Sequence, residues 1–393
     1  MARREVVIAR SIVYGILTAL PTGEPAHKPS LIRKILRLLN VFWLTFGLVR
    51  ADVFRELRET WQITEADYRA SFGAAESQLD GHNRRRGTRG VAKKKDVLKS
   101  MGDMGYSGST FFRTTDGAYL VKSVPRHFEH DFFKNELLLP YAEHMHQNPD
   151  SLLTRITDML FRTHHSIGEF LGLAPSHHIV MENILYGQDH AQSSDSRKDW
   201  ESWDLKPSSY FFPERDIAGG ALTSEATKSK LADEFDGTIK LSQRDATQFV
   251  EMLEKDTQLL AEHNAVDYSL FLVRISAEEA PAPEDQPSLE SGQVSDEPIP
   301  PAQPPFAPPT PPSWRTGIRS SDGKEVYRAA ILDFFWAKHT LRAKVMTGLV
   351  RSYNVIDQQG PMSITAESTE YRERFLKMCT GFIEVAEEIL IPV

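Results

Sequence analysis

Alternating apolar and polar positions predict a β-hairpin over residues 110–124. Two runs rich in aromatic and β-branched residues flank an Asp-Gly pair at 116–117. Aspartate and glycine tolerate the positive φ angles of a tight turn, so this pair favours a chain reversal. Since side chains alternate along a strand, Lys122 shares one face with Leu120 and Val124. A cation among apolar neighbours needs an anionic partner.

The same reasoning predicts further strands and helices. Apolar runs at residues 178–185 and 326–336 predict buried strands, the second of which contains Asp333 at its end. Apolar residues at helical spacing predict helices at residues 1–20, 31–49, 128–146, 149–161 and 242–263, two short helices within 52–72, and a C-terminal helix from about residue 369. Within 52–72, Thr64 and Asp67 are expected to form an N-cap and its acidic partner.

Composition divides the chain. Twelve of the 23 prolines lie between Pro281 and Pro312, mixed with Glu, Asp, Gln and Ser. Such a segment cannot bury enough apolar surface to become ordered, so residues 276–314 are expected to be a disordered insertion, with polyproline recognition as the alternative. This segment also carries seven of the acidic residues, so the rest of the chain is close to neutral although the whole has a net charge of −8.

Charge and cysteine content limit the compartment and the partners. The single cysteine, Cys379, excludes internal disulfides and cysteine-rich zinc sites and fits an intracellular protein. The uncharged stretch at 38–49 is far shorter than the roughly 20 residues needed to cross a bilayer, so a helix packed on the domain is favoured over one lying on a membrane. Seven basic residues within 81–95 form either a solvated loop or a surface that attracts anionic lipid or polyphosphate.

Several polar residues fit phosphoryl transfer. A bend rich in Gly and Ser at 105–109 precedes the hairpin, and its backbone N–H groups could approach phosphates that Lys122 also contacts. The alternative is an ordinary hairpin whose lysine extends to water. Three further residues follow in the order that phosphoryl transfer requires: Lys206 for phosphate contact, Asp267 for activation of a hydroxyl and Asp333 for Mg²⁺ binding. Each aspartate alone could instead be a cap or turn residue.

The ordered motifs define a resemblance. They are FRELRE at 54–59, ADYRASF at 66–72, SGS at 107–109 with FF at 111–112, YLVKS at 119–123, YAEHMHQNPDSLL at 141–153, VMEN at 180–183, WDLKPSSY at 203–210, VDYSLFL at 266–272, ILDFF at 331–335 and YRERF at 371–375. Together they cover nearly the whole chain apart from the insertion, and DLK with DYSL is the most specific combination. The chain resembles the phosphatidylinositol phosphate kinases, and within them the phosphatidylinositol 4-phosphate 5-kinase type most closely.

This resemblance implies an α+β, two-lobed kinase-like fold of antiparallel sheets with packed helices. It divides the chain into an N-terminal helical, dimerisation-like segment (1–80), an N-lobe with the glycine-rich loop and the ATP lysine (81–185), and a C-lobe with the catalytic and metal aspartates (186–393), which the 276–314 insertion interrupts. The implied partners are a phosphoinositide lipid and an anionic membrane surface, not nucleic acid. A homodimer is allowed, and the expected location is cytoplasmic and peripheral at a membrane.

The implied reaction transfers the γ-phosphate of ATP, with Mg²⁺, to the inositol ring of a phosphatidylinositol monophosphate, with phosphatidylinositol 4-phosphate as the expected acceptor. The residues that the resemblance assigns are Asp267 and Lys206 to catalysis, Ser107, Gly108, Ser109, Lys122, Met181 and Asn183 to ATP, Asp333 to the metal, and Arg342, Lys344 and Arg351 to lipid and membrane. It also offers Glu129 as an acidic partner of Lys122.

Three departures from the family pattern keep other functions open. Pro207 stands where the family has glycine after DLK, Asp-Met-Leu at 158–160 replaces Gly-Leu-Tyr, and paired lysines are not evident after Asp333. Proline fixes φ and removes an N–H, so the backbone near Lys206 must differ from the family's. The alternatives are a pseudokinase scaffold that binds nucleotide or phosphoinositide without turnover, and a soluble kinase acting on protein or small molecules.

Overall fold

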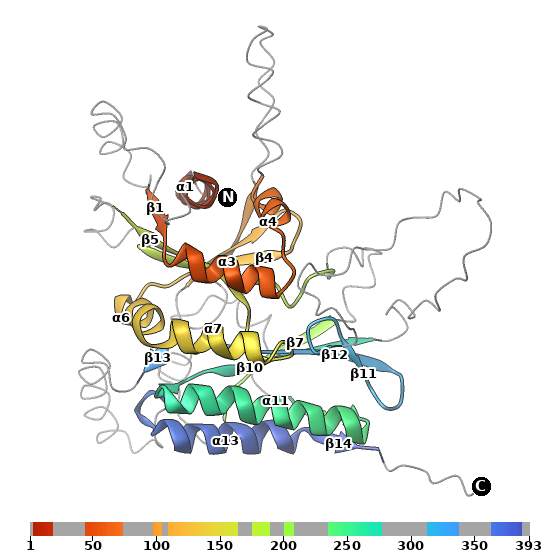
Figure 1. Cartoon of the computed structure of the whole chain (residues 1–393). Helices are drawn as coiled ribbons and strands as arrows, with labels where there is room; N and C mark the ends of the chain where they lie inside the picture. The colour runs from red at the N-terminus through yellow and green to blue at the C-terminus, as the bar shows by residue number, and fades with distance from the viewer. Residues whose placement is uncertain are drawn as a thin grey trace, which may run out of the picture.

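The fold is built from two main β-sheets and the helices packed on them (Figure 1). The computed structural model describes residues 3–18, 44–73, 97–103, 109–163, 175–188, 200–207, 235–276, 313–337 and 363–386. Helices and mainly antiparallel strands are both abundant in these residues, which confirms the predicted α+β class.

The first sheet has six strands in the order β1-β5-β6-β4-β3-β2, all antiparallel to their neighbours. Their bounds are Phe46–Leu48 (β1), Leu98–Asp103 (β2), Thr110–Thr114 (β3), Tyr119–Ser123 (β4), Ile156–Arg162 (β5) and His177–Glu182 (β6). β3 and β4 form the predicted hairpin. Its turn is closed by the Asp116 carboxylate, which accepts hydrogen bonds from Thr114 Oγ1 at 2.5 Å and from the Ala118 N–H at 3.0 Å, while Gly117 takes a φ of +78°.

The first half of the chain also forms helices, of which α1 and α3 pack against this sheet. The helices are α1 (Arg3–Thr18), α3 (Ala51–Thr60), α4 (Glu65–Ser71), α6 (His127–Phe132) and α7 (Leu138–Gln147), with a π-helical turn, η1 (Phe133–Leu137), between the last two. These helices confirm the predictions for residues 1–20, 52–72 and 128–146. Thr64 caps α4 as expected, because its hydroxyl oxygen accepts the Asp67 N–H at 3.1 Å.

Two predicted helices are wrong where the structure describes them. Within residues 149–161, the chain is extended and becomes β5, and every side chain from Ile156 to Leu160 is buried. A run buried on both faces lacks the alternation that marks a half-exposed strand, so its short apolar pattern resembles a helix. Within residues 31–49, Phe46–Leu48 is strand β1, and the residues before 44 lie outside the described chain.

The second sheet has four strands in the order β11-β12-β10-β7. Its strands are Trp200–Leu205 (β7), Ser269–Ser276 (β10), Ile318–Arg319 (β11) and Glu325–Leu332 (β12). Two small pairs accompany it, β9 (Ala265–Val266) with β13 (Trp336–Ala337) and β8 (Ile239–Leu241) with β14 (Ile383–Val385). The helices here are α11 (Gln243–Glu262), α13 (Ser368–Gly381) and the 3-10 turn η4 (Ser363–Thr365), which confirms the two predicted long helices.

The elements lie in two tiers (Figure 1). The six-stranded sheet with α1 and α3 makes the upper tier, α11 and α13 run side by side at the bottom, and α6 and α7 lie between them. β1 lies within the predicted N-terminal segment, residues 1–80, but pairs with β5 of the first sheet. The predicted boundaries at 80 and 185 stay predictions, and residues 277–312 of the expected insertion lie outside the described chain.

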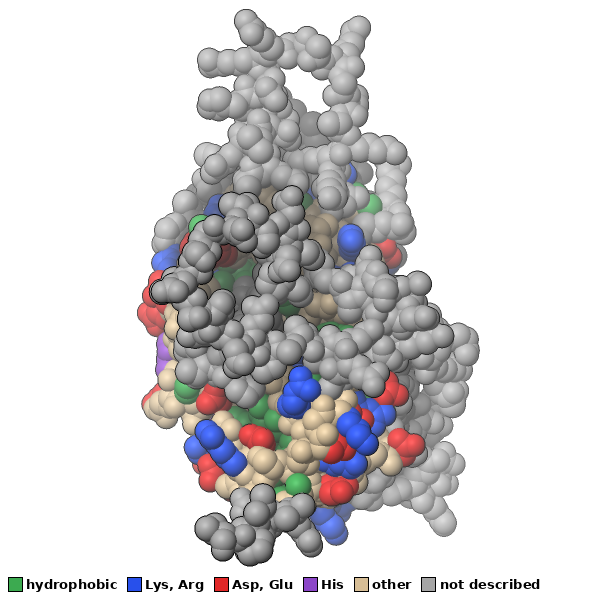
Figure 2. Space-filling model, turned by 90° about the vertical axis from the view of Figure 1, so that its right-hand side faces the viewer, with side chains coloured by type: hydrophobic (Ala, Val, Ile, Leu, Met, Phe, Trp, Pro, Cys, Tyr) green, Lys and Arg blue, Asp and Glu red, His purple; other side chains and the backbone are tan. Residues whose placement is uncertain are grey.

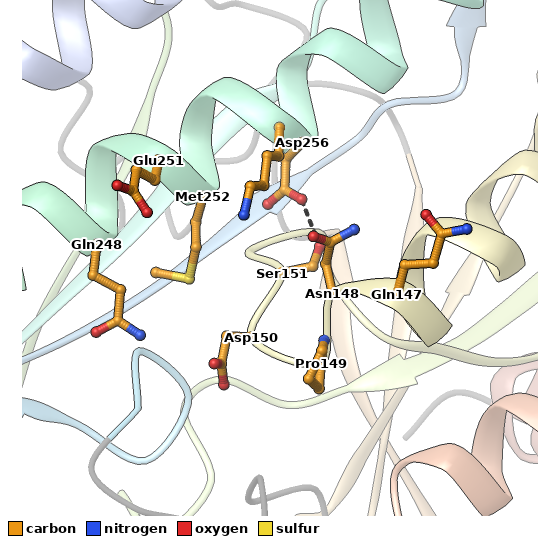
Figure 3. Close-up of a pocket in the computed structure, with 10 residues that line it drawn as sticks. Gln147, Asn148, Pro149, Asp150, Ser151, Gln248, Glu251, Met252 and Asp256 are labelled. Atoms are coloured by element: carbon orange, nitrogen blue, oxygen red, sulfur yellow. Dashed lines mark hydrogen bonds between the residues drawn. The ribbon is translucent and has the colours of Figure 1, made fainter.

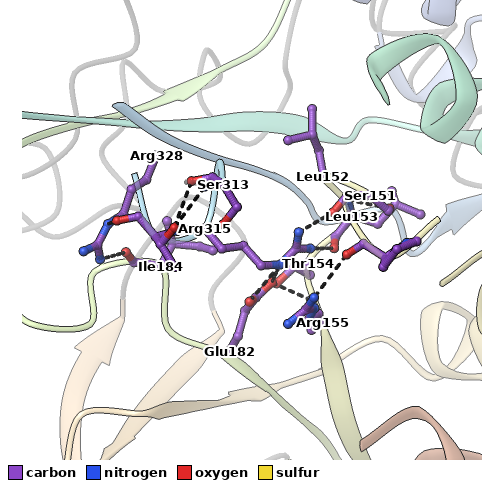
Figure 4. Close-up of polar contacts among 12 residues, drawn as sticks. Ser151, Leu152, Leu153, Thr154, Arg155, Glu182, Ile184, Ser313, Arg315 and Arg328 are labelled. Carbon is purple, nitrogen blue, oxygen red and sulfur yellow. Dashed lines mark hydrogen bonds and ion pairs between the residues drawn. The ribbon is translucent and has the colours of Figure 1, made fainter. Parts of the chain in front are cut away.

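A buried arginine joins the two tiers (Figure 4). Arg315, 5% exposed, forms an ion pair with Glu182 at the end of β6, with Nε 3.1 Å from each carboxylate oxygen. Its other nitrogens donate to the carbonyls of Ser151 and, at 2.7 Å, Leu153. The connecting segment that carries these carbonyls also bonds to β12, because the Ile331 N–H donates to the Leu152 carbonyl at 2.7 Å. The Arg315 guanidinium therefore links Glu182 of the first sheet to the segment that bonds to β12 of the second sheet.

Stability is expected to fall at acidic pH because of His178. This side chain is fully buried against Phe46, and neither ring nitrogen has a hydrogen-bond partner. Burial lowers the pKa of His178 from 6.5 to about 3. Between these values the unfolded chain binds a proton that the folded chain does not, so the contribution is complete above pH 6.5 and is lost progressively toward pH 3, by up to about 1.4 kcal/mol per pH unit.

The variant His178→Leu tests this. Urea unfolding at pH 7.5, 6.0 and 5.0 should show a smaller loss of unfolding free energy in the variant than in the wild type, whatever the two stabilities are at pH 7.5. Equal losses in the two proteins would contradict the assignment.

Candidate functional site

The two candidate aspartates lie at one end of the two central strands of the second sheet, β10 and β12. β10 and β12 are antiparallel neighbours with Ser269 opposite Leu332, and β9 and β13 pair with Val266 opposite Trp336. Asp267 lies between β9 and β10, and Asp333 lies between β12 and β13. The two strand pairs therefore bring together two bends that are 66 positions apart in sequence.

Both aspartates have a left-handed backbone. Their φ angles are 68° for Asp267 and 63° for Asp333. Non-glycine residues avoid this region, although aspartate tolerates it better than most, and such conformations are found mainly where surrounding contacts impose them and a function uses them. One such contact is the 2.6 Å hydrogen bond from the Tyr371 hydroxyl to the Tyr268 carbonyl, next to Asp267.

An ion pair between the two sheets joins Lys122 to Asp333. Lys122, on β4, donates from Nζ to Asp333 Oδ1 and lies 5.5 Å from the centre of the Phe111 ring. The Lys122 side chain is 9% exposed and that of Asp333 is 37% exposed. Burial is the largest single influence and alone would raise the pKa of Asp333, but the charge and hydrogen bond of Lys122 together with the charges of Lys206 and Arg126 outweigh it, and the pKa is lowered. The cation predicted to need an anionic partner has one, and that partner is the predicted metal ligand.

A second ion pair joins Lys206 to Asp267. Lys206 follows β7, whose last residue, Leu205, pairs with Leu270 of β10. Its Nζ lies 3.3 Å from Asp267 Oδ1. Burial alone would lower the pKa of Lys206, but the charges of Asp267 and two further aspartates outweigh it, and the pKa is raised. Pro207 therefore does not prevent the lysine before it from reaching the predicted catalytic aspartate.

The structure adds Asp204 to this group. Asp204 lies on β7 opposite Phe271, and its Oδ1 is buried without a hydrogen-bond partner. Burial raises its pKa and the charge of Asp333 adds to this, against the nearby Lys206. An unpartnered buried carboxylate oxygen beside a second carboxylate is suited to a cation. Its position in the Asp-Leu-Lys motif is the signal in the sequence, although the predicted role of that motif belonged to Lys206 alone.

Asp204 and Asp333 could supply only some of the ligands that Mg²⁺ needs. Among the described residues, His, Cys, Asp and Glu side chains make no group of three or more that could hold a metal. Mg²⁺ sites in phosphoryl-transfer proteins commonly use only one or two carboxylates and complete their coordination with substrate phosphates and water. Asp333 and Asp204 offer the two carboxylates that such a site uses, and binding of Mg²⁺ to them stays a prediction.

The hairpin and the end of β6 hold two further predicted residues. Met181 lies on β6 opposite Leu120, and its side chain is buried. The Asn183 side-chain amide donates to the Gly117 carbonyl at 2.7 Å, and its oxygen accepts the Leu185 N–H at 3.2 Å. These contacts brace the β3–β4 turn against the end of β6, so the Asn183 side chain is used structurally, and contact of either residue with ATP stays a prediction.

The offered partner of Lys122, Glu129, bonds elsewhere. Its Oε1 lies 2.8 Å from Nη1 of Arg126, three residues earlier. Burial raises the pKa of Glu129 although the charges of Arg126 and Lys122 oppose it. Glu129 therefore lies within the electrostatic reach of the site, but Asp333 is the residue that contacts Lys122.

Five predicted residues lie outside the described chain: Ser107, Gly108, Arg342, Lys344 and Arg351. Of the predicted phosphate-covering bend, the structure describes Ser109, which is buried just before β3. The roles of all six stay predictions.

A cavity of about 230 Å³ lies elsewhere, between residues 147–151 and α11 (Figure 3). Its lining contains none of the predicted site residues. Asp256, in its wall, accepts hydrogen bonds from Ser151 Oγ at 2.7 Å and the Leu152 N–H at 2.6 Å. Its carboxylate thus holds the chain between α7 and β5.

The amino-acid sequence is similar to those of known proteins. Residues 92–382 match the family model described as Phosphatidylinositol-4-phosphate 5-Kinase. A phosphatidylinositol 4-phosphate 5-kinase of Plasmodium falciparum is 26% identical over 258 residues, which are 64% of this chain and 13% of that protein. A phosphatidylinositol 4-phosphate 5-kinase-like protein 1 of Mus musculus is 25% identical over 255 residues, 64% of this chain and 53% of that protein.

A third relative, a probable phosphatidylinositol phosphate kinase of Dictyostelium discoideum, is 25% identical over 228 residues, 56% of this chain and 26% of that protein. The matched regions thus span about half or less of the length of these relatives. The family match, however, extends over most of the present chain and includes both lysine–aspartate pairs. The chain belongs to the phosphatidylinositol-4-phosphate 5-kinase family.

Proposed function

We propose that the chain is an active lipid kinase that transfers the γ-phosphate of ATP to phosphatidylinositol 4-phosphate, giving the 4,5-bisphosphate. The observation that carries the proposal is the convergence of two lysine–aspartate pairs from four separate parts of the chain, Lys122–Asp333 and Lys206–Asp267. The names of the relatives support the choice of acceptor.

In this proposal each residue has one role. Lys122 contacts the ATP phosphates, Lys206 contacts the phosphate in transfer, and Asp267 accepts the proton of the inositol hydroxyl. Asp333 and Asp204 hold Mg²⁺, which when bound neutralises phosphate charge. Ser107, Gly108 and Ser109 cover the phosphates.

Charge balance supports the need for a divalent cation. Fully ionised, the three aspartates and two lysines of the group carry a net charge of −1, which repels a polyphosphate. Each lysine is also paired with an aspartate in the structure, so binding of ATP must compete with these contacts. If Asp204 and Asp333 held a divalent cation, the net charge of the group would become +1, and Lys122 would be available to contact the phosphates.

We propose that the lipid is reached from a membrane surface on the cytoplasmic side. The described residues contain no helix with the length and apolar character needed to cross a bilayer. On the face in Figure 2, basic and acidic side chains are intermixed over the lower part of the described surface, so this part does not form a basic membrane-binding surface. Arg342, Lys344 and Arg351 remain the proposed lipid contacts, and a homodimer remains a proposal.

The substrate is tested by measuring initial rates of transfer of labelled phosphate from Mg-ATP. The acceptors are vesicles that contain phosphatidylinositol 3-, 4- or 5-phosphate, and a soluble inositol phosphate without acyl chains. We expect the highest rate with phosphatidylinositol 4-phosphate and little transfer to the soluble head group. Equal rates with soluble and vesicle acceptors would contradict the membrane proposal, and a preference for another isomer would contradict the acceptor.

A pseudokinase scaffold is the second candidate, and Pro207 is the observation that favours it. Proline directly after Lys206 removes a backbone N–H next to the lysine that is proposed to contact the transferred phosphate. Nucleotide or vesicle binding without turnover on any acceptor would support this candidate.

A further inference from the structure

The proposed catalytic aspartate has a second partner from a distant part of the chain. Ser363 begins η4 and is fully buried, and its hydroxyl donates to Asp267 Oδ1 at 2.7 Å. Lys206 Nζ lies 3.3 Å from the same oxygen. Both of these contacts go to Oδ1. Ser363 is 96 positions from Asp267, so no local pattern in the sequence marks the contact.

Two donors on one oxygen restrict how the carboxylate can turn. An aspartate side chain has two rotatable bonds, and a single lysine on a flexible stem fixes neither tightly. A buried serine hydroxyl is more rigid, because only one rotatable bond separates its oxygen from the backbone. The backbone of Asp267 is also held, since Tyr371 on α13 bonds to the next carbonyl, that of Tyr268. Residues 363–371 thus brace the catalytic bend through one side-chain and one backbone contact.

We propose that Ser363 is a positioning residue, which holds Asp267 Oδ1 so that Oδ2 is presented to the attacking inositol hydroxyl. The inference rests on the proposed function. Ser363 does not touch the substrates in this account and carries no charge, so its removal should leave the binding of ATP and lipid unchanged. The effect should appear in kcat, because misplacing a catalytic group by a small distance is costly.

The test compares Ser363→Ala, Ser363→Thr and Ser368→Ala with the wild type. Ser368 is a matched control, since it is also buried and lies five residues later, but its hydroxyl donates to the Ala261 carbonyl at 2.9 Å. We expect Ser363→Ala to lower kcat roughly tenfold to a hundredfold with KM for ATP and lipid within about twofold. Ser363→Thr keeps the hydroxyl and should recover most of kcat, and Ser368→Ala should leave kcat near the wild-type value.

The outcomes separate the two proposals. An inactive wild type overturns the proposed function, and the role of Ser363 with it. An active wild type with unchanged kcat in Ser363→Ala overturns only the role of Ser363, as does an equal loss of kcat in Ser368→Ala. If Ser363→Ala unfolds early in a thermal scan, the Ser363→Thr variant decides: a well-folded Thr variant with a kcat close to the wild type supports the role, and a well-folded Thr variant with the loss expected for alanine overturns it.

Discussion

Replacing Asp333 by asparagine is expected to lower the rate of phosphate transfer at least about a hundredfold, which is the usual loss when a charge-stabilising group is removed. The substitution removes the carboxylate that Lys122 contacts and that we assign to Mg²⁺, and it leaves a buried ammonium group without its partner. The measurement is the initial rate on phosphatidylinositol 4-phosphate vesicles at saturating Mg-ATP, together with the Mg²⁺ concentration that gives half of the maximal rate. That concentration should rise in the variant.

Two further variants sharpen this result. Asp267→Asn removes the proposed proton acceptor and should lower kcat by about 10² to 10⁴ without changing the Mg²⁺ requirement. Asp322→Asn is the matched control. Asp322 pairs with Lys240 at 3.1 Å in an exposed turn, and it has no role in the proposed site. Its rate should equal that of the wild type. Activity of Asp333→Asn close to the wild type would contradict the metal assignment.

Replacing Arg315 by methionine is expected to lower the free energy of unfolding by about 3–5 kcal/mol, the usual cost of removing one partner of a buried ion pair. The substitution leaves the Glu182 carboxylate buried without its cation and removes donors from the carbonyls of Ser151 and Leu153. Urea unfolding followed by tryptophan fluorescence measures the change.

Two comparisons test whether the loss of unfolding free energy in Arg315→Met comes from the buried ion pair. Adding Glu182→Gln to Arg315→Met should recover part of the loss, because the amide is uncharged and can still accept the Arg155 N–H, which bonds to Glu182 Oε1 at 2.8 Å. Arg50→Met removes an arginine whose pair with Asp52 is exposed, and it should cost less than about 1 kcal/mol. A loss in Arg315→Met no greater than in Arg50→Met would show that the buried pair does not hold the tiers together.

The features that could be predicted from sequence are those whose cause is local. The hairpin follows from the Asp-Gly pair at 116–117, and the cap of α4 follows from the spacing of Thr64 and Asp67. Lys122, Asp267 and Asp333 were found because each belongs to a short motif, and the two ion pairs agree with the grouping.

The features that could not be predicted depend on distant parts of the chain. The run at Ile156–Arg162 is a strand because β1 and β6 flank it, and neither neighbour is visible in its own sequence. Ser363 is an ordinary serine until the fold places it beside Asp267. Asn183 belongs to a recognised motif, but its hydrogen bonds to the hairpin turn are set by the packing of β6 against β4.

The most direct test of the central claim is the identity of the lipid product. Wild-type protein is incubated with Mg-ATP and vesicles containing phosphatidylinositol 4-phosphate, and the lipids are separated by head group, with Asp267→Asn of equal thermal stability alongside. We predict that the wild type forms the 4,5-bisphosphate and that the variant forms it at least about a hundredfold more slowly. A wild type that binds Mg-ATP and the vesicles but forms no bisphosphate would contradict the claim and leave the scaffold as the function of this chain.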